Sequence, residues 1–250
     1  MLVFKGVETL IDLGHTVATV GSFDGVHSGH SALLTTLRQS AQSSGCKSVV
    51  VSLTPHPRVI LSRAEGLELL TCDEEKILLL EQQGIDALLL LEFTEEFSRL
   101  SYERFLCDYL LAPLKMQQLI VGFNHRLGHD AAGHNKLKEM AKRYNFEVTQ
   151  TQEQIDSQAK ISSTTIRERL AAGDIATANR LLSHPYLIIG TTNSEGLVQI
   201  DEPLKLIPPA GKYRCTIGEK ESVVAIDSQR RVWCEQRSAR VEINFISALK

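Results

Sequence analysis

The sequence predicts an α/β fold: a doubly wound, Rossmann-like parallel sheet followed by a small all-β domain. Two observations support this prediction. Segments with strand and helix patterns alternate over the first three quarters of the 250-residue chain, an order typical of parallel sheets covered by helices. After Pro185 only short strand-like runs follow, separated by Gly, Pro, Asn, Ser and Asp, as in small sheets and barrels. The predicted domains are residues 1–184 and 185–250.

Five buried strands are expected in the first domain. Each is a short apolar run bounded by polar or turn residues, and the third is almost wholly apolar, as in a strand buried on both faces. The five strands are expected at residues 16–23, 47–53, 86–93, 117–123 and 146–151.

Helical patterns fill the intervals between these strands. Residues 71–74 (Thr-Cys-Asp-Glu) resemble a capping box, and the hydroxyl run at residues 162–165 is an N-cap signal. Helices are expected at residues 31–44, 71–83, 101–111, 135–145 and 175–182. A further helix is expected to begin at the hydroxyl run. In the second domain the strand-like runs are expected at residues 187–189, 197–200, 204–207, 213–217, 222–226, 231–234 and 240–245.

Composition narrows the class of protein. The formal net charge is −3, which does not indicate a nucleic-acid surface. Five scattered cysteines without a Cys-x-x-Cys pair are typical of a reducing compartment. The N-terminus lacks the pattern of a signal peptide, and the most apolar run, residues 87–91, is too short to span a bilayer. We therefore expect a cytoplasmic protein that binds neither nucleic acid nor membrane.

The stretch from residue 21 to residue 30 (Gly-Ser-Phe-Asp-Gly-Val-His-Ser-Gly-His) is the most distinctive one. It joins the first strand to the first helix, and its glycines let backbone N–H groups approach a ligand. A helix N-terminus adds free N–H donors and a partial positive charge, which favour a bound phosphate. His27 and His30 would reach that phosphate. The alternatives are a zinc site, although the zincin spacing is absent, and a structural turn with incidental histidines.

Polar residues also follow the second and fourth predicted strands. Residues 55–58 (Pro-His-Pro-Arg) form a stiff loop, which either contacts a ligand or only punctuates the chain. His125, His129 and His134 form a second histidine cluster, for which a polar loop over the site and a metal site are both open. Carboxyl ends of parallel strands meet at one sheet edge, where ligands bind in such folds. The sequence therefore predicts one site at this edge.

A cation in the first turn of the helix that follows the hydroxyl run is unusual, because the helix dipole disfavours it there. Arg167 has this position. An anion bound at the helix start would explain it, although Ser162, Ser163 and Thr164 are also explained as a simple cap. The Walker A, Gly-x-Gly-x-x-Gly and Gly-x-Ser-x-Gly patterns are absent from the sequence.

Four motifs together carry a family resemblance over residues 10–185. They resemble, in the same order, those of the bacterial FAD synthetases, usually bifunctional riboflavin kinase/FMN adenylyltransferases with an HxGH nucleotidyltransferase domain. The motifs are Gly21-Ser22-Phe23-Asp24-Gly25-Val26-His27-x-Gly29-His30, Pro55-His56-Pro57-Arg58, Val121-Gly122-Phe123-Asn124-His125-Arg126-x-Gly128 and Ser162-Ser163-Thr164-x-Ile166-Arg167.

The resemblance implies transfer of AMP from ATP to FMN, giving FAD and pyrophosphate with Mg²⁺. The implied catalytic residues are His27, His30, Ser162 and Arg167. The implied nucleotide- or flavin-binding residues are Gly21, Ser22, Phe23, Asp24, His56, Pro57, Arg58, Gly122, Asn124, Arg126, Ser163 and Thr164. No protein ligand for a metal is implied, since Mg²⁺ would be held mostly by phosphate oxygens and water.

The chain departs from the family at Leu53, Thr54 and Leu127, where other residue types are usual. These departures affect the expected stacking of protein side chains on the flavin. After Pro185 a riboflavin kinase domain would be about twice as long, and its Gly-x-Pro-Thr-Ala-Asn signature is absent. The tail is therefore interpreted as a degenerate kinase-like remnant without kinase activity. Two alternatives remain open: nucleotidyl transfer to another small phosphate, and a non-catalytic flavin- or nucleotide-binding regulator. The sequence makes no prediction of oligomeric state.

Overall fold

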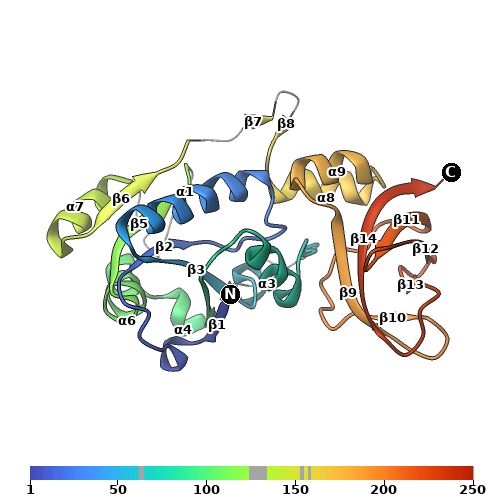
Figure 1. Ribbon diagram of the computed structural model, residues 1–250, viewed down its shortest axis with the longest axis horizontal. Coiled ribbons are helices and arrows are strands. Elements are labelled where there is room, and N and C mark those ends of the chain that lie inside the picture. The colour runs from blue at the N-terminus through green and yellow to red at the C-terminus, as the bar shows by residue number, and fades with distance from the viewer. Residues whose placement is uncertain (62–64, 124–133, 153–154, 157–158, 250) are drawn as a thin grey trace. The chain divides into compact units, whose positions relative to one another are not determined.

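The computed structural model describes residues 1–61, 65–123, 134–152, 155–156 and 159–249 (Figure 1). The chain forms two compact units. Unit 1 comprises Met1–Phe23, His30–Leu67 and Leu79–Glu153, and unit 2 comprises Asp24–Gly29, Glu68–Leu78 and Gln154–Lys250. The fold class is confirmed, since unit 1 holds a parallel sheet with helices and unit 2 an antiparallel sheet. A domain boundary between residues 184 and 185 stays a prediction.

Unit 1 is built on a parallel sheet with the order β1-β4-β3-β2-β5-β6. Its strands are β1 (Leu2–Lys5), β2 (Thr16–Val20), β3 (Lys47–Thr54), β4 (Ala87–Glu92), β5 (Met116–Val121) and β6 (Glu147–Gln150). All five predicted strands are present, and every residue of β2 is buried between its neighbours. β1 was not predicted; it is a four-residue edge strand with a single buried residue, Phe4.

Helices occupy the connections of this sheet. They are η1 (Val7–Thr9), α1 (Ser28–Ser44), α2 (Pro57–Ile60), α3 (Asp73–Gln82), α4 (Glu95–Ser98), α5 (Tyr102–Phe105), the π-helical η2 (Leu106–Leu111), α6 (Ala112–Leu114) and α7 (His134–Tyr144). Because β-α-β crossovers are right-handed, α1 between β2 and β3 and α7 between β5 and β6 cover opposite faces. The face covered by α7 also buries Tyr102, Phe105 and Leu110 of the α5–η2 region.

Two helix predictions are wrong in detail. The expected capping box at residues 71–74 is shifted by one residue, because the Cys72 N–H donates to Glu75 Oε2 at 2.8 Å. The helix expected at residues 101–111 changes to π geometry in η2 and then continues through Pro113 in α6. Proline is tolerated there because the first turn of a helix segment does not need its N–H.

The described part of unit 2 contains helices α8 and α9, the start of α3, and an antiparallel sheet with the order β10-β9-β14-β11-β12-β13. The elements are the short β7 (Ile155–Asp156) and β8 (Ala159–Lys160), α8 (Ser163–Ala171), α9 (Ile175–Leu182), β9 (Tyr186–Thr192), β10 (Val198–Gln199), β11 (Gly211–Ile217), β12 (Lys220–Ile226), β13 (Val232–Trp233) and β14 (Arg240–Leu249). A bridge between Leu197 and Trp233 joins the two ends of the sheet, so it closes like a small barrel.

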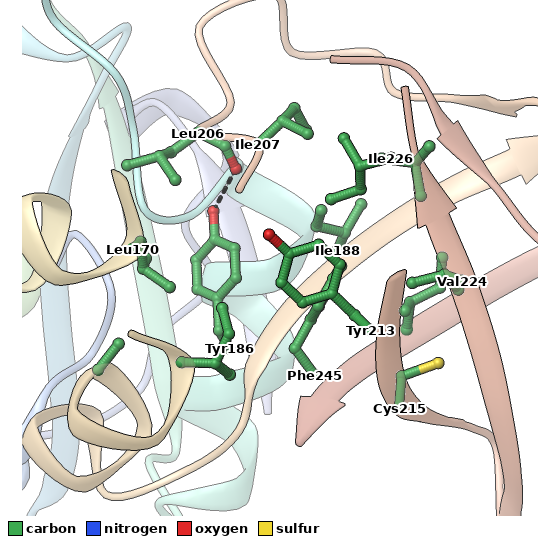
Figure 2. Packing of buried hydrophobic residues seen from close by; sticks show 14 of the residues in the cluster. Leu170, Tyr186, Ile188, Leu206, Ile207, Tyr213, Cys215, Val224, Ile226 and Phe245 are labelled. Carbon is green, nitrogen blue, oxygen red and sulfur yellow. Dashed lines mark hydrogen bonds between the residues drawn. The ribbon is translucent and has the colours of Figure 1, made fainter. Parts of the chain in front are cut away.

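The sheet of unit 2 is closed around an apolar core (Figure 2). Tyr186, Tyr213 and Phe245 form its aromatic centre, with the rings of the last two 5.5 Å apart and nearly perpendicular. The Tyr186 hydroxyl donates to the Leu206 carbonyl at 2.6 Å, which satisfies its buried oxygen (Figure 2). The strand expected at residues 204–207 is wrong: Lys205 makes only a one-residue parallel bridge with Leu69.

Candidate functional site

The turn between β2 and α1 has a strained backbone. Phe23, Gly25 and Val26 have φ angles of 48°, 82° and 39°. Glycine adopts this left-handed region freely, whereas a β-branched residue such as Val26 does so at a cost. Strain of this kind persists only where surrounding contacts over-determine the backbone, and it gathers at functional sites. The contacts that hold this turn therefore identify the residues that fix its backbone.

Asp24 organises the part of the turn that belongs to unit 2. Its carboxylate is 3% exposed, and Oδ1 accepts hydrogen bonds from the backbone N–H groups of Leu70 at 2.9 Å and Thr71 at 3.0 Å. Its Oδ2 accepts from Arg167 Nη2 at 2.5 Å. The Asp24 carboxylate is the anion beside Arg167, so this cation near the start of α8 is explained within the protein. Arg167 is the fifth residue of α8 and therefore lies just beyond the first turn, whereas the sequence had placed it within that turn. A contact of either residue with a nucleotide stays a prediction.

The backbone of the same turn is held from three separate segments of the chain. The Asp24 carbonyl accepts from Ser163 Oγ at 3.1 Å, and the Gly25 N–H donates to Thr71 Oγ1 at 3.1 Å. The Gly25 carbonyl lies 2.9 Å from His184 Nε2. The contacts of Thr71 and His184 with this turn were not predicted, since both residues are distant from the turn in the chain. Thr71 was recognised only as part of the expected capping box, and His184 belongs to no recognised motif.

His27 follows this turn and is only 8% exposed. Burial lowers its pKa from the ordinary 6.5 to about 4, although the nearby Asp24 charge acts in the opposite direction. The imidazole is therefore neutral at pH 7 and carries an N–H donor rather than a positive charge. Gly29 leaves room for the ring, because a Cβ there would lie 3.2 Å from His27 Cε1 and Nδ1.

Helix α8 begins at the predicted hydroxyl run. Ser162 is its N-cap, and Ser162 Oγ accepts from the Thr165 N–H at 3.2 Å. Ser163 contributes to the turn through the bond to Asp24 described above, whereas Thr164 is exposed. The N-cap prediction is confirmed, and the structure brings Asp24, Ser163 and Arg167 together within unit 2.

In unit 1, the predicted residues follow neighbouring strands at one edge of the sheet. Gly21 follows β2, Pro55 follows β3 and Gly122 follows β5, and these three parallel strands are adjacent. The expected clustering at the carboxyl edge is therefore confirmed for the described residues. In the same unit the Phe23 ring is buried, with its centroid 5.1 Å from that of His30.

Close packing explains the small residues beside Phe23. A Cβ on Gly21 would lie 3.1 Å from Phe23 Cε2, which is tighter than ordinary contact. The Ser22 carbonyl accepts a hydrogen bond from Ser52 Oγ at 3.3 Å. The turn residues of unit 1 are thus fixed to β3, whose end leads into the Pro-His-Pro-Arg loop.

That loop starts the short helix α2. His56 is its N-cap, with Nδ1 accepting from the Arg58 N–H at 3.2 Å, and Pro57 takes the first helical position. After β5, the Phe123 side chain is 54% exposed. Several predicted residues lie outside the described residues: Asn124, His125, Arg126, Leu127 and His129.

Among the residues that the structure describes, no group of three or more His, Cys, Asp or Glu side chains is placed to hold a metal ion. The described helices likewise include none long and apolar enough to cross a membrane.

Comparison with known proteins places these motifs in context. The profile of the FAD synthetase family matches residues 11–165. The bifunctional riboflavin kinase/FMN adenylyltransferase of Listeria monocytogenes is 36% identical over 178 residues, which are 70% of this chain and 56% of that protein. The protein of the same description from Escherichia coli K12 is 34% identical over 193 residues, 76% of this chain and 62% of that protein. The matches thus span less than two thirds of these curated relatives.

A solved structure shares the whole architecture. The crystal structure of a macrolide-efflux protein from Streptococcus pneumoniae superposes with a TM-score of 0.85, covering 100% of both chains at 20% sequence identity. At this identity the likeness concerns the fold alone. It shows that the short closed sheet accompanies the parallel sheet in another chain as well.

Proposed function

Because the chain belongs to the FAD synthetase family, we propose that it transfers AMP from ATP to FMN, giving FAD and pyrophosphate, with Mg²⁺ as cofactor. The observation that carries this proposal is the strained turn before α1, in which Asp24 is fixed and the neutral His27 follows. Family membership supports the substrates, and the turn supports the use of phosphate contacts.

The proposed reaction needs positioning more than an activated nucleophile. An FMN phosphate oxygen attacks the α-phosphorus of ATP, and the bond to the bridging oxygen of the β-phosphate breaks as pyrophosphate leaves. The FMN phosphate is already largely ionised at neutral pH, since its second pKa is about 6. The protein must hold two anions in line and stabilise the charge that develops on the α-phosphate and the leaving group.

We assign the phosphate contacts to the HxGH stretch and the start of α8. His27 and His30 would donate N–H groups to the ATP phosphates in the transition state. Ser162, Ser163 and Thr164 belong to the proposed triphosphate site at the helix start. Arg167 uses two of its five N–H donors on Asp24 and the Glu68 carbonyl, which would orient the remaining donors toward phosphate.

Mg²⁺ fits this site only as a phosphate-bound ion. The Asp24 carboxylate already accepts hydrogen bonds from Leu70, Thr71 and Arg167 and is buried. Phosphate oxygens and water would therefore hold the ion, as is common for Mg²⁺, and the ion would neutralise the charge of the triphosphate.

Further nucleotide- or flavin-binding residues are assigned to the edge of unit 1. Gly21, Ser22, Phe23, His56, Pro57, Arg58 and Gly122 lie there, and Asn124 and Arg126 are proposed on sequence alone. Leu53 and Thr54, the last residues of β3, are the departures that keep another small phosphate acceptor as the alternative. We also propose that the closed sheet of unit 2 has no riboflavin kinase activity.

The test is incubation of the purified chain with Mg-ATP and either FMN or riboflavin, with products separated by chromatography. FAD formed from FMN supports the proposal. FMN formed from riboflavin would refute the assignment of the closed sheet. Tight flavin binding without turnover of any phosphate acceptor would favour the regulator instead.

A substitution tests the assignment of His30. His30→Ala is expected to reduce turnover about 10²-fold or more, because it removes a donor that acts in the transition state. The circular dichroism spectrum should not change. Full activity of this variant would exclude His30 from the mechanism.

A further inference from the structure

The segment Glu68–Thr71 lies directly against the phosphate-binding turn within unit 2. Leu70 and Thr71 donate their backbone N–H groups to Asp24 Oδ1, at 2.9 and 3.0 Å. The carbonyl of Glu68 accepts from Arg167 Nε at 2.5 Å. One short stretch of backbone therefore orients both partners of the Asp24–Arg167 ion pair.

The same segment is bonded to the loop that precedes β11. The Leu69 N–H donates to the Leu204 carbonyl at 2.7 Å, and the Leu206 N–H donates to the Leu69 carbonyl at 2.8 Å. Lys205 Nζ adds a bond to the Leu70 carbonyl at 2.6 Å. The segment thus lies between the turn and the closed sheet, with hydrogen bonds to each.

Arg230 provides a second connection, from the turn between β12 and β13. Its Nη1 lies 2.6 Å from Glu68 Oε1. Its Nε and Nη2 donate to the Ile207 carbonyl, the former at 3.2 Å. One guanidinium therefore links three parts of unit 2: the β12–β13 turn, the loop before β11, and the segment that carries Leu70 and Thr71.

We propose that Lys205 and Arg230 are positioning residues of the phosphate-binding turn. They hold Glu68–Thr71, which in turn fixes Asp24 and Arg167. This role gives the closed sheet a part in nucleotidyl transfer without a catalytic group of its own. The effect of these two residues on the reaction rate rests on the proposed function, whereas their effect on the structure of the turn does not.

The physical basis is that Asp24 is buried and the turn is strained. A buried carboxylate is stable only while hydrogen-bond donors face it. If these donors move away, the charge stays buried without partners, which costs free energy. The left-handed backbone of Val26 persists only while the surrounding contacts hold it. A shift of Glu68–Thr71 would therefore change the turn that leads into His27.

The test compares two neighbouring arginines. Arg230→Met removes the contacts to Glu68 and Ile207, whereas Arg231→Met removes a contact to Asp227 within its own turn. The two side chains are 46% and 50% exposed, and the two variants lose the same charge. Arg231 also lies over the Trp233 ring, so its loss perturbs the sheet but not Glu68–Thr71.

Hydrogen exchange of the full chain is the first readout. For Arg230→Met we expect exchange at the amides of Gly25, Leu70 and Thr71 to become about fivefold faster or more, and Arg231→Met to leave it within about twofold of wild type. Arg230→Lys, which keeps the charge beside Glu68, should restore part of the protection. Unchanged exchange at these amides in Arg230→Met would overturn the proposal.

Kinetics is the second readout. If the chain makes FAD, kcat of Arg230→Met should fall about fivefold or more with little change in the KM for ATP, while Arg231→Met stays within about twofold of wild type. Equal rates for both variants and wild type would also overturn the proposal. If the wild type makes no FAD, the proposed function fails, but the exchange measurement still decides whether Arg230 holds the turn.

Discussion

Replacing Lys205 by methionine tests the most deeply buried ion pair of unit 2. The Lys205 and Glu75 side chains are 1% and 0% exposed, with Nζ 2.6 Å from Glu75 Oε2. Lys205 Nζ also donates to the carbonyls of Leu70 at 2.6 Å and Leu187 at 2.8 Å, so all three of its N–H groups are used. Methionine keeps most of the aliphatic stem but provides no donor.

The expected cost follows from what remains behind. Glu75 still accepts from the N–H groups of Cys72 and Ile189, but it loses its cation while staying buried. Removing one partner of a buried ion pair costs about 3–5 kcal/mol, mainly because the other charge is left uncompensated. We expect the free energy of unfolding of unit 2 to fall by about 4 kcal/mol, a large part of the stability of an ordinary domain.

Urea denaturation followed by tryptophan fluorescence measures this unit selectively. Trp233 is the only tryptophan of the chain and lies in β13. With a urea dependence of about 2 kcal/mol per molar, the midpoint should fall by about 2 M. Lys212→Met is the matched control, because Lys212 is an exposed residue of β11, and its midpoint should change by less than about 0.3 M.

A second substitution separates charge from packing. Adding Glu75→Gln to Lys205→Met removes the buried charge and should recover a substantial part of the lost stability. If Lys205→Met unfolds at the same urea concentration as Lys212→Met, the pair does not stabilise the unit. If the double variant is less stable than Lys205→Met, packing or hydrogen bonds rather than the uncompensated charge dominate.

Two further predictions concern His27. Its pKa is lowered by folding from 6.5 to about 4, so the unfolded chain binds more protons between these values. The resulting stability is present above pH 6.5 and is lost as the pH falls toward 4, by at most about 3 kcal/mol. His27→Gln should flatten the dependence of the unfolding free energy on pH in this window, and an unchanged slope would contradict the assignment. If the chain makes FAD, Gly29→Ala should lower the rate of FAD formation about tenfold or more, since its Cβ would lie 3.2 Å from the His27 ring. Gly211→Ala, whose Cβ would meet Tyr213 only at ordinary contact distance, should remain active; equal activities would show that the His27 ring tolerates displacement.

Local patterns in the sequence were sufficient for most of the fold. Apolar runs located all the central strands of unit 1, because a strand buried on both faces has few other compositions. The cap of α8 was found at Ser162, since an N-cap bond joins residues only three apart. β1 escaped detection because an edge strand of four residues with one buried side chain carries almost no periodic signal.

Long-range pairs account for what sequence reasoning missed at the site. The hydroxyl run and Arg167 were located, but the partner of Arg167 is Asp24, 143 positions away. The run at residues 204–207 has a strand-like composition, yet its partner is Leu69, and a single bridge replaces a ladder. No spacing rule connects such residues, so only the structure shows that Asp24 is held by Leu70, Thr71 and Arg167.

The distance along the chain between Asp24 and its supports has a consequence for synthesis. Asp24, Glu68 and Arg167 reach the ribosome exit long before Arg230, and at about 5–20 residues per second the delay from Asp24 to Arg230 is about 10–40 s. During that interval β2 and β3 can already pair, while the turn between β2 and α1 lacks Lys205 and Arg230. The turn between β2 and α1 is therefore expected to reach its final structure late, after the last strands have been made. If the proposed function holds, a released chain that ends at residue 184 should contain the parallel sheet but bind nucleotide weakly.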